Sequence, residues 1–149
     1  MKLVLDSSVV AKLFFKEAGS DEAIKLMELQ DAMDMEFLAS DLVIYEVGNT
    51  IWKNLGKKKK DGSRYIKLLF LLDIEFTHLD DGLAYEALKL AQKNNITYYD
   101  GVHVALSKKN QATLVTQDKE LLKKFKDALS IEGILERIEY LLSSNNVFI

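Results

Sequence analysis

The chain has 149 residues and a formal net charge of −3, and it contains neither cysteine nor proline. Its length suits one domain with a proper core, and its 48% hydrophobic and 29% charged residues are typical of a globular protein. The lack of cysteine excludes disulfides and thiolate metal sites, and no apolar run approaches the roughly 18 residues that cross a bilayer. We therefore expect a single cytoplasmic domain over residues 1–149 with no membrane association.

Short apolar runs alternate along the chain with longer segments of helical periodicity. The apolar runs predict strands at residues 2–5, 37–39, 74–79 and 113–116. The periodic segments predict helices at about residues 8–17, 21–34, 42–55, 63–72, 81–95, from 100 onward, 118–126 and 132–142, with a short edge strand at 128–131. Strands separated by helices form parallel sheets with helices on both faces. We therefore expect a three-layer α/β/α fold around a mainly parallel central sheet.

Four acidic side chains stand at positions in this pattern where a ligand would bind. Asp6 ends the first strand, and Asp118 follows the fourth. Asp100 stands at the start of a helix, and Glu46 lies within the third helix. The carboxyl ends of strands in an open α/β sheet line its ligand crevice. Carboxylates gathered there would repel one another unless a cation neutralised them, and oxygen ligands suit a hard divalent cation.

The motifs around these acids resemble those of the PIN-domain family, and within it the VapC-type toxins. The chain opens with a strand and Asp6-Ser7-Ser8, which matches the family's D-x-S motif. Glu46 lies on a helix about forty residues further on, with Asn49 one turn later. The segment from Tyr99 to Leu106 matches the helix that carries the third acid, and Thr116-Gln117-Asp118 matches the T-x-D that ends the next strand. The order and spacing of the motifs carry the resemblance.

The resemblance runs from Met1 to about Phe125 and has two departures. Gly101 stands where the family usually has Ala, and the family's last strand is hard to find in this sequence. The resemblance implies a Mg²⁺- or Mn²⁺-dependent endoribonuclease that hydrolyses RNA phosphodiester bonds and leaves a 5′-phosphate and a 3′-hydroxyl. It further implies the toxin of a type II toxin–antitoxin pair, a homodimer and, commonly, an antitoxin partner.

The resemblance also suggests what the individual side chains do. It implies catalysis and metal binding by Asp6, Glu46, Asp100 and Asp118, of which Asp6 and Asp100 are the firmest ligands. Ser8 and Thr116 would position the nucleophilic water. Asn49 lies one helical turn after Glu46, so it is placed to orient that carboxylate or to hold a water on the metal.

Each acid also has an ordinary structural role that the sequence leaves open. Asp6, Asp100 and Asp118 all stand at helix starts, where Asp is a common N-cap. Glu46 borders an apolar stripe and would normally extend to water. His103, one turn after Asp100, is a candidate proton donor or substrate contact, but a structural role is more common for such a residue.

A basic cluster is the candidate RNA-binding surface. It lies near the end of the Glu46 helix and consists of Lys57, Lys58, Lys59, Lys60 and Arg64. Cations beside a phosphodiester-cleaving site contact backbone phosphates, although a solvated helix end is the more common explanation for such a run. Further along, the segment from Tyr65 to Leu72 is apolar almost all round. That pattern predicts either a partner contact or a central place in the core.

Two other functions are compatible with the same fold and motifs. One is a PIN-fold RNA-processing nuclease that has no antitoxin. The other is a catalytically silent module that binds RNA or protein, although all four acids of the motif are present. A phosphotransferase of the haloacid-dehalogenase type is disfavoured, because Ser8 stands where that class has a second Asp.

Overall fold

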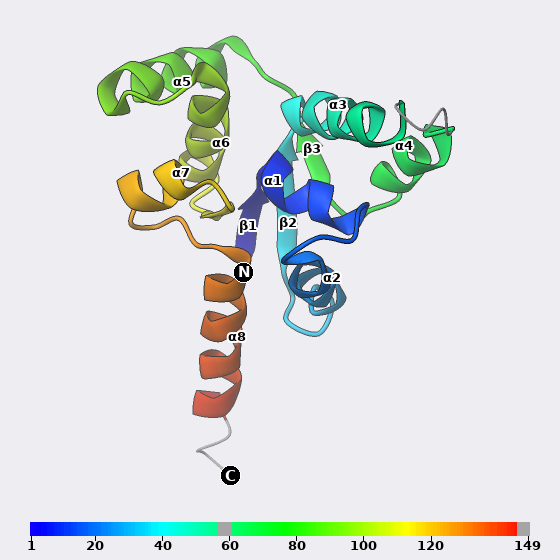
Figure 1. Ribbon diagram of the computed structural model, residues 1–149. Coiled ribbons are helices and arrows are strands. Elements are labelled where there is room, and N and C mark those ends of the chain that lie inside the picture. Colours follow the sequence, from blue (N-terminus) through cyan, green and yellow to red (C-terminus); the bar gives the residue numbers. More distant parts are fainter. Residues whose placement is uncertain (57–60, 146–149) are drawn as a thin grey trace.

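A four-stranded parallel sheet forms the centre of the protein (Figure 1). The computed structural model describes residues 1–56 and 61–145. The strands are β1 (Lys2–Leu5), β2 (Glu36–Ser40), β3 (Glu75–Thr77) and β4 (Thr113–Val115), in the order β3-β2-β1-β4. Each neighbouring pair is parallel. The predicted parallel sheet is confirmed, and β1 lies inside it with a partner on each side.

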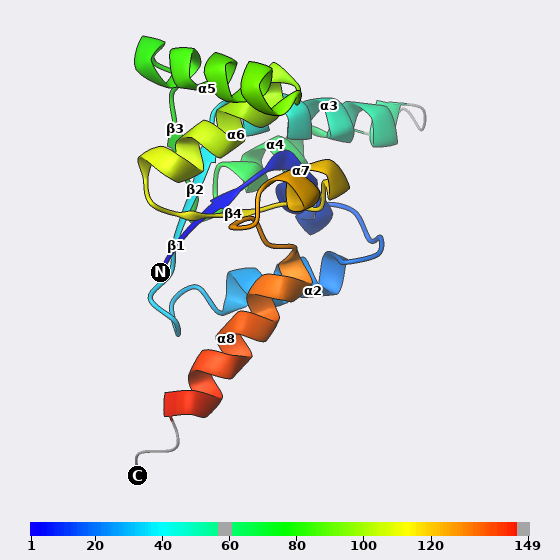
Figure 2. The same cartoon turned by 90° about the vertical axis from the view of Figure 1, so that its left-hand side faces the viewer.

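The helices surround this sheet and connect its strands. They are α1 (Ser7–Val10), the 3₁₀ helix η1 (Ala11–Leu13), α2 (Ser20–Glu28), α3 (Leu42–Gly56), α4 (Ser63–Leu69), α5 (Asp81–Asn94), α6 (Tyr98–Lys109), α7 (Lys119–Lys124) and α8 (Ile131–Asn145). In the described part of the chain, no helix combines the length and the apolar character needed to cross a membrane. Figure 2 shows α8 extending away from the sheet at the end opposite to α5.

The two faces of the sheet bury separate apolar cores. Successive side chains on a strand point to opposite faces, so Leu3 and Leu5 pack into one core and Val4 packs into the other. Residues of α1, α2, α3, α4 and α8 share the core of Leu3 and Leu5, whereas residues of α5, α6 and α7 share that of Val4. The expected three-layer α/β/α arrangement follows directly.

Two early helices end sooner than the periodicity predicts. The first helix stops in η1 at Leu13, because the hydroxyl of Ser20 holds the next loop by accepting from the amide of Glu17 and donating to the carbonyl of Phe15. The second ends at Glu28, and the chain then turns back toward β2 through a left-handed residue, Asp34 (φ 47°). Local hydrogen bonds and turns override helical periodicity in both places.

The helix α6 sits closer to α5 than a side chain at Gly101 would permit. A Cβ placed on Gly101 would lie 2.5 Å from the carbonyl oxygen of Ala87 on α5. The departure from Ala to Gly at this position therefore has a packing cause. Every residue from Gly101 to Ser107 is buried, and this close contact fixes the helix that carries Asp100 and His103.

The predicted edge strand at 128–131 is reduced to one bridge. Leu129 pairs in parallel with Val115, its amide donates to the carbonyl of Leu114, and its carbonyl accepts from Thr116. The last helix then begins at Ile131. A single bridge at this edge leaves the start of β4 beside an open cavity rather than beside a full fifth strand.

Candidate active site

Asp6 is held at the carboxyl end of β1 by hydrogen bonds on both carboxylate oxygens. Its Oδ1 accepts from the amide of Ser8 at 2.7 Å and from the hydroxyl of the same residue at 2.5 Å. Its Oδ2 accepts from the hydroxyl of Thr116. Burial, with only 5% of the residue exposed, raises the pKa of Asp6, although these hydrogen bonds and the nearby ring of His103 oppose the rise. The predicted N-cap role is confirmed as well, since Asp6 caps α1.

The hydroxyls of Ser8 and Thr116, which donate to Asp6, also join the loop after β4 to the end of β1. The Thr116 hydroxyl accepts from the amide of Asp118 at 3.0 Å, and the Ser8 hydroxyl accepts from the amide of Gln117 at 2.9 Å. Because a hydroxyl has a single proton to donate, each gives that proton to the Asp6 carboxylate. The loop after β4 is thereby tied to the end of β1.

Glu46 reaches the same region from α3 and meets His103 of α6. The Nε2 of His103 lies 3.4 Å from the Oε2 of Glu46, and only 3% of the histidine is exposed. Burial would raise the pKa of Glu46, but His103 and the hydroxyl of Ser7 outweigh it and hold this pKa below its ordinary value. Glu46 Oε2 and His103 Nδ1 are buried without a hydrogen-bond partner among the described residues.

Asp100 and Asp118 are less enclosed than Asp6. Thr97, not Asp100, caps α6, and its hydroxyl both donates to the Asp100 carboxylate at 2.6 Å and accepts from the Asp100 amide. The carboxylate of Asp118 caps α7 by accepting from the amides of Glu120 and Leu121 at 2.7 and 2.9 Å. Asp118 is exposed and Asp100 half-buried. Both acids therefore have structural roles at the start of a helix.

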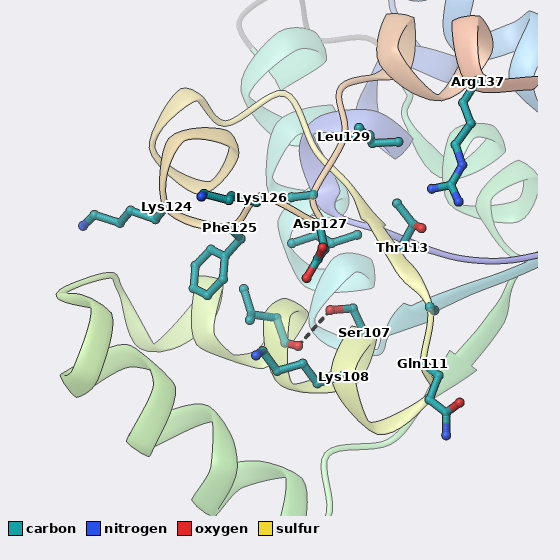
Figure 3. A pocket seen from close by; sticks show the side chains of 14 residues that line it. Ser107, Lys108, Gln111, Thr113, Lys124, Phe125, Lys126, Asp127, Leu129 and Arg137 are labelled. Carbon is teal, nitrogen blue, oxygen red and sulfur yellow. Dashed lines mark hydrogen bonds between the residues drawn. The ribbon is translucent and has the colours of Figure 1, made fainter. Parts of the chain in front are cut away.

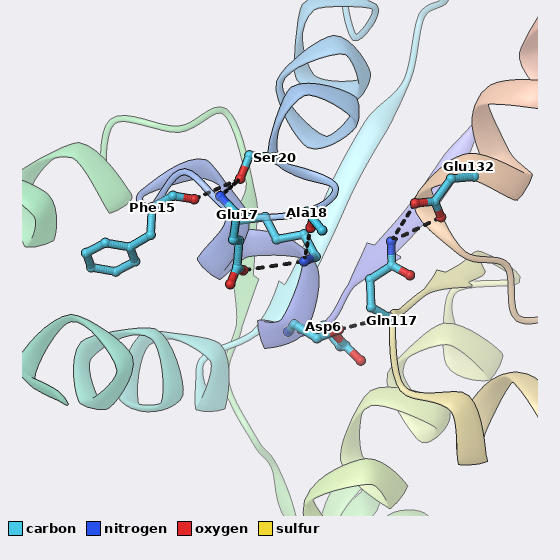
Figure 4. Close-up of polar contacts among 9 residues, drawn as sticks. Asp6, Phe15, Glu17, Ala18, Ser20, Gln117 and Glu132 are labelled. Carbon is cyan, nitrogen blue, oxygen red and sulfur yellow. Dashed lines mark hydrogen bonds and ion pairs between the residues drawn. The ribbon is translucent and has the colours of Figure 1, made fainter. Parts of the chain in front are cut away.

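The loop that carries Thr116 and Asp118 is also tied to the last helix. The side-chain amide of Gln117 donates to the carboxylate of Glu132 in the first turn of α8, at 3.2 and 3.5 Å (Figure 4). Ile131 and Ile134 are fully buried and dock this end of α8 into the core. Sequence reasoning did not assign Gln117 or Glu132 to the site, because only the fold brings residues 117 and 132 together.

The donor atoms suit a hard cation, but their grouping is incomplete. All four predicted ligands offer carboxylate oxygens, which a hard cation prefers. The buried Oε2 of Glu46 makes no hydrogen bond within the described residues, although the Nε2 of His103 lies 3.4 Å away. Asp6 and Glu46 share His103 as a neighbour. Within residues 1–56 and 61–145, however, no three His, Cys, Asp or Glu side chains are grouped closely enough to hold a metal ion. The carboxylate oxygens therefore suit a divalent cation by their chemistry.

Other predicted residues lie at the edge of this region or beyond it. Asn49 is exposed on α3, and it is His103 that lies against Glu46. Arg64 donates to the hydroxyl of Tyr65 at 3.1 Å and stacks over its ring. Lys57, Lys58, Lys59 and Lys60 of the predicted RNA-binding cluster lie outside the described residues.

Comparisons with known proteins identify the family of this site. The family model of the PIN domain matches residues 3–128. The chain belongs to the PIN-domain family. Among curated PIN-domain relatives, Ribonuclease VapC3 of Pyrobaculum aerophilum is 32% identical over 84% of this chain and 95% of its own. Exonuclease VapC9 of the same organism is 35% identical over 65% of this chain and 73% of its own.

Solved structures agree with the PIN-domain assignment. The crystal structure of PAE2754 from Pyrobaculum aerophilum matches with a TM-score of 0.70 and 29% identity, over 94% of this chain and 90% of that chain. A toxin–antitoxin complex from Klebsiella pneumoniae shares the fold at 16% identity and a TM-score of 0.66, over 87% of this chain and 97% of that chain. At that identity the second likeness concerns the fold alone.

Proposed function

We propose that this PIN-domain protein is a Mg²⁺- or Mn²⁺-dependent endoribonuclease of the cytoplasm and the toxin of a type II toxin–antitoxin pair. The observation that carries the proposal is Asp6, a buried carboxylate at a strand end, bonded on both oxygens and sharing His103 with Glu46. Burial removes water from the charged form of a carboxylate, which raises its pKa and costs folding free energy. Such an arrangement is typical of functional sites, where perturbed groups cluster.

The cation in this proposal would be held by Asp6 and Glu46, with Asp100 and Asp118 completing the site directly or through water. When bound, it would supply positive charge beside the scissile phosphate and lower the pKa of an attacking water. Asp6 and Glu46 are the pair that we favour, because both are at least partly buried and both lie near His103. The resemblance gives Asp100 a firmer place beside Asp6, and we propose Asp100 and Asp118 as further ligands.

The chain's own groups would fix the Asp6 carboxylate before substrate arrives. Ser8 and Thr116 each commit their hydroxyl proton to Asp6, so these protons orient the carboxylate and are not available to the phosphate. Hydrogen bonds of this kind hold a metal ligand in position. The predicted water-positioning role would then fall to lone pairs of these hydroxyls that can accept a hydrogen bond from water.

Cleavage of a circular RNA tests both the activity and its endonucleolytic mode. The purified protein should open a single-stranded circle in the presence of Mn²⁺ or Mg²⁺ and should be inactive in EDTA. An exonuclease cannot act on a circle, so degradation of linear RNA alone would overturn the endonucleolytic mode. Failure of the wild-type protein to cleave either substrate with metal present would overturn the assigned function and favour a silent binding module.

A homodimer is part of the same proposal, and α4 is its candidate surface. Leu69 of α4 is fully buried, but Leu68, Phe70 and Leu71 are 49%, 56% and 79% exposed. Of the two explanations for this apolar segment, the observed exposure favours a partner contact over a central place in the core. Changing Phe70 and Leu71 together to Ser should convert a dimer to a monomer in sedimentation. A wild-type monomer at micromolar concentration would contradict this part of the proposal.

An antitoxin is the second partner we propose. The fold shared with a toxin–antitoxin complex and the VapC names of the curated relatives support it. The direct check is the neighbouring reading frame, whose product should form a complex with this protein and inhibit RNA cleavage. A complex that leaves cleavage unchanged, or no complex at all, would favour an RNA-processing nuclease without an antitoxin.

A further inference from the structure

A cavity lies beside the start of β4, on the side of the sheet covered by α6 and α7. Its volume is about 620 Å³, within the range of roughly 300–1,000 Å³ that small-molecule sites occupy. It opens where the predicted edge strand is reduced to the bridge at Leu129. Its lining comes from α6, from β4, from the segment that follows α7, and from α8 (Figure 3).

The lining of this cavity is strongly basic although the whole chain is acidic. Four cations line it, namely Lys108, Lys124, Lys126 and Arg137, against one acid, Asp127. The formal charge of the chain is −3. A concave surface lined by one sign of charge focuses its field and concentrates ligands of the opposite sign. The expected ligand is therefore an anion.

The cations come from separate elements and are not equally free. The ammonium of Lys124 donates to the carbonyl of Asn95 at 2.7 Å and to Glu120, so we assign it a structural role. Lys108 comes from α6, Lys126 follows α7, and Arg137 comes from α8. Figure 3 shows the Arg137 side chain extending toward Thr113. Cations from three different segments suit the successive phosphates of an RNA strand better than they suit one isolated carboxylate.

The uncharged part of the lining combines the polar residues Ser107, Gln111 and Thr113 with apolar residues that include one aromatic ring. Phe125 is half-buried beside the cavity, and the buried side chains of Val104 and Leu114 also line it. Aromatic rings stack with nucleobases of any sequence, and unpaired bases of RNA are recognised in this way. A phosphate-binding rim combined with an aromatic wall is the chemistry of a nucleotide site.

The position of the cavity relates it to the candidate active site. Leu114 lines the cavity, and Thr116, whose hydroxyl bonds to Asp6, lies two residues further along the extended chain. Residues two apart on a strand point to the same face and are separated by about 7 Å. Both residues are buried, so the cavity at the start of β4 and the Asp6 site at the carboxyl ends of the strands are separate places, which one RNA chain would contact through different nucleotides.

We propose that this cavity seats an unpaired nucleotide of the RNA substrate away from the cleaved position, with its phosphates at Lys126 and Arg137 and its base on Phe125. The inference rests on the proposed ribonuclease function and names the substrate as single-stranded RNA. It also supplies a basic RNA contact that is separate from the lysine run at 57–60.

Binding of a fluorescein-labelled 12-nucleotide RNA of random sequence, measured in EDTA to prevent cleavage, tests this site. The double variant Lys126→Ala/Arg137→Ala should bind more weakly than wild type. Its slope of log K against log salt should be smaller by about 1.4, since each phosphate contact on a single strand contributes about 0.7. Asp127→Asn should tighten binding by removing the one acid from the lining.

Two further variants separate a built site from general attraction. Phe125→Leu keeps an apolar side chain for packing but removes the stacking face, and should weaken binding about fivefold or more. The matched control is Lys93→Ala/Lys123→Ala, which removes the same charge from two exposed lysines outside the cavity lining. If the control double weakens binding as much as the cavity double, or if Phe125→Leu binds like wild type, the nucleotide site is wrong.

The cleavage assay keeps this inference distinguishable from the proposed function. Wild-type cleavage with an unchanged KM for linear 12-nucleotide RNA in Lys126→Ala/Arg137→Ala would overturn the cavity site and leave the ribonuclease proposal standing. A raised KM with kcat nearly unchanged supports the site, since Lys126 and Arg137 would act in binding. A wild-type protein that neither binds nor cleaves RNA would overturn both proposals together.

Discussion

Asp6 and Asp118 occupy equivalent places in the chain but different environments in the folded protein. Each follows a parallel strand and caps the next helix. Asp6 is buried with hydroxyl donors on both oxygens, whereas Asp118 is exposed and accepts only backbone amides of α7. Asp6 follows β1, which has strands on both sides, while Asp118 follows β4 at the edge. Asp6 directly follows its strand, whereas Asp118 lies beyond the buried Thr116 in the loop after β4, and this loop brings it to the surface.

The largest expected effect is on RNA cleavage. Asp6→Asn should reduce kcat to about one hundredth or less, the scale seen when a group that stabilises the transition state directly is removed. It should also weaken Mn²⁺ binding while the fold remains intact. Asp118→Asn keeps a good N-cap residue and should cost less activity, because its carboxylate is exposed. Equal losses in the two variants, measured with the same RNA, would contradict the different roles assigned to these acids.

Thr116 gives the next largest effect, on stability. Thr116→Val keeps the shape of a fully buried side chain but removes the hydroxyl between Asp6 and the amide of Asp118. A buried polar group left unpaired costs about 1–3 kcal/mol, so urea unfolding should show a loss in that range. Ser8→Ala is the matched control on the more exposed side of Asp6 and should cost less. A stability of Thr116→Val equal to wild type would show that the link is not formed.

The pH dependence of stability should separate the two acids further. Burial raises the pKa of Asp6, so the folded protein holds a proton there more tightly than the unfolded chain does. The free energy of unfolding in EDTA should therefore fall as the pH rises from the unfolded pKa of about 3.9 through the folded pKa, then level off. Asp6→Asn should remove this fall, and Asp118→Asn should retain it.

Glu46 contributes to the same titration with the opposite sign. Its pKa is held below the ordinary value by His103 and Ser7 despite burial, so its stabilisation is present at high pH and is lost as the pH falls through the folded pKa. Glu46→Gln should therefore deepen the fall caused by Asp6, when unfolding in EDTA is followed across the acidic range. Identical profiles in wild type, Asp6→Asn and Glu46→Gln would contradict both pKa shifts.

The smallest expected effect concerns the loop that carries Asp118. Glu132→Ala removes the acceptor for Gln117 and should lower kcat a few-fold with little change in KM. Glu132→Gln keeps an acceptor oxygen and should restore activity. Glu136→Ala, an exposed acid one turn further along α8, is the control. Activity lost equally in Glu132→Ala and Glu136→Ala would mean that α8 acts through its charge or its stability and not through Gln117.

Periodicity and strand-end acids predicted more of the fold than of the site. The parallel sheet and most helix positions follow from local sequence patterns. In each strand, for example, successive side chains point alternately to the two cores. The second helix ends six residues early at Glu28, since a turn through Asp34 overrides the pattern. The contact between Glu46 and His103 joins α3 to α6, and no local pattern marks such a pair.

By itself, the sequence determined the family, the parallel architecture and the identity of the acids at the strand ends, because these depend on residue type and short spacing. Only the tertiary structure decided which acid is buried, since burial depends on the segments that pack around each side chain, as Asp6 and Asp118 demonstrate. The tertiary structure also decided that Lys126, Arg137 and Phe125 line one cavity. Long-range packing sets such encounters, and residues far apart in the chain carry no signal of them.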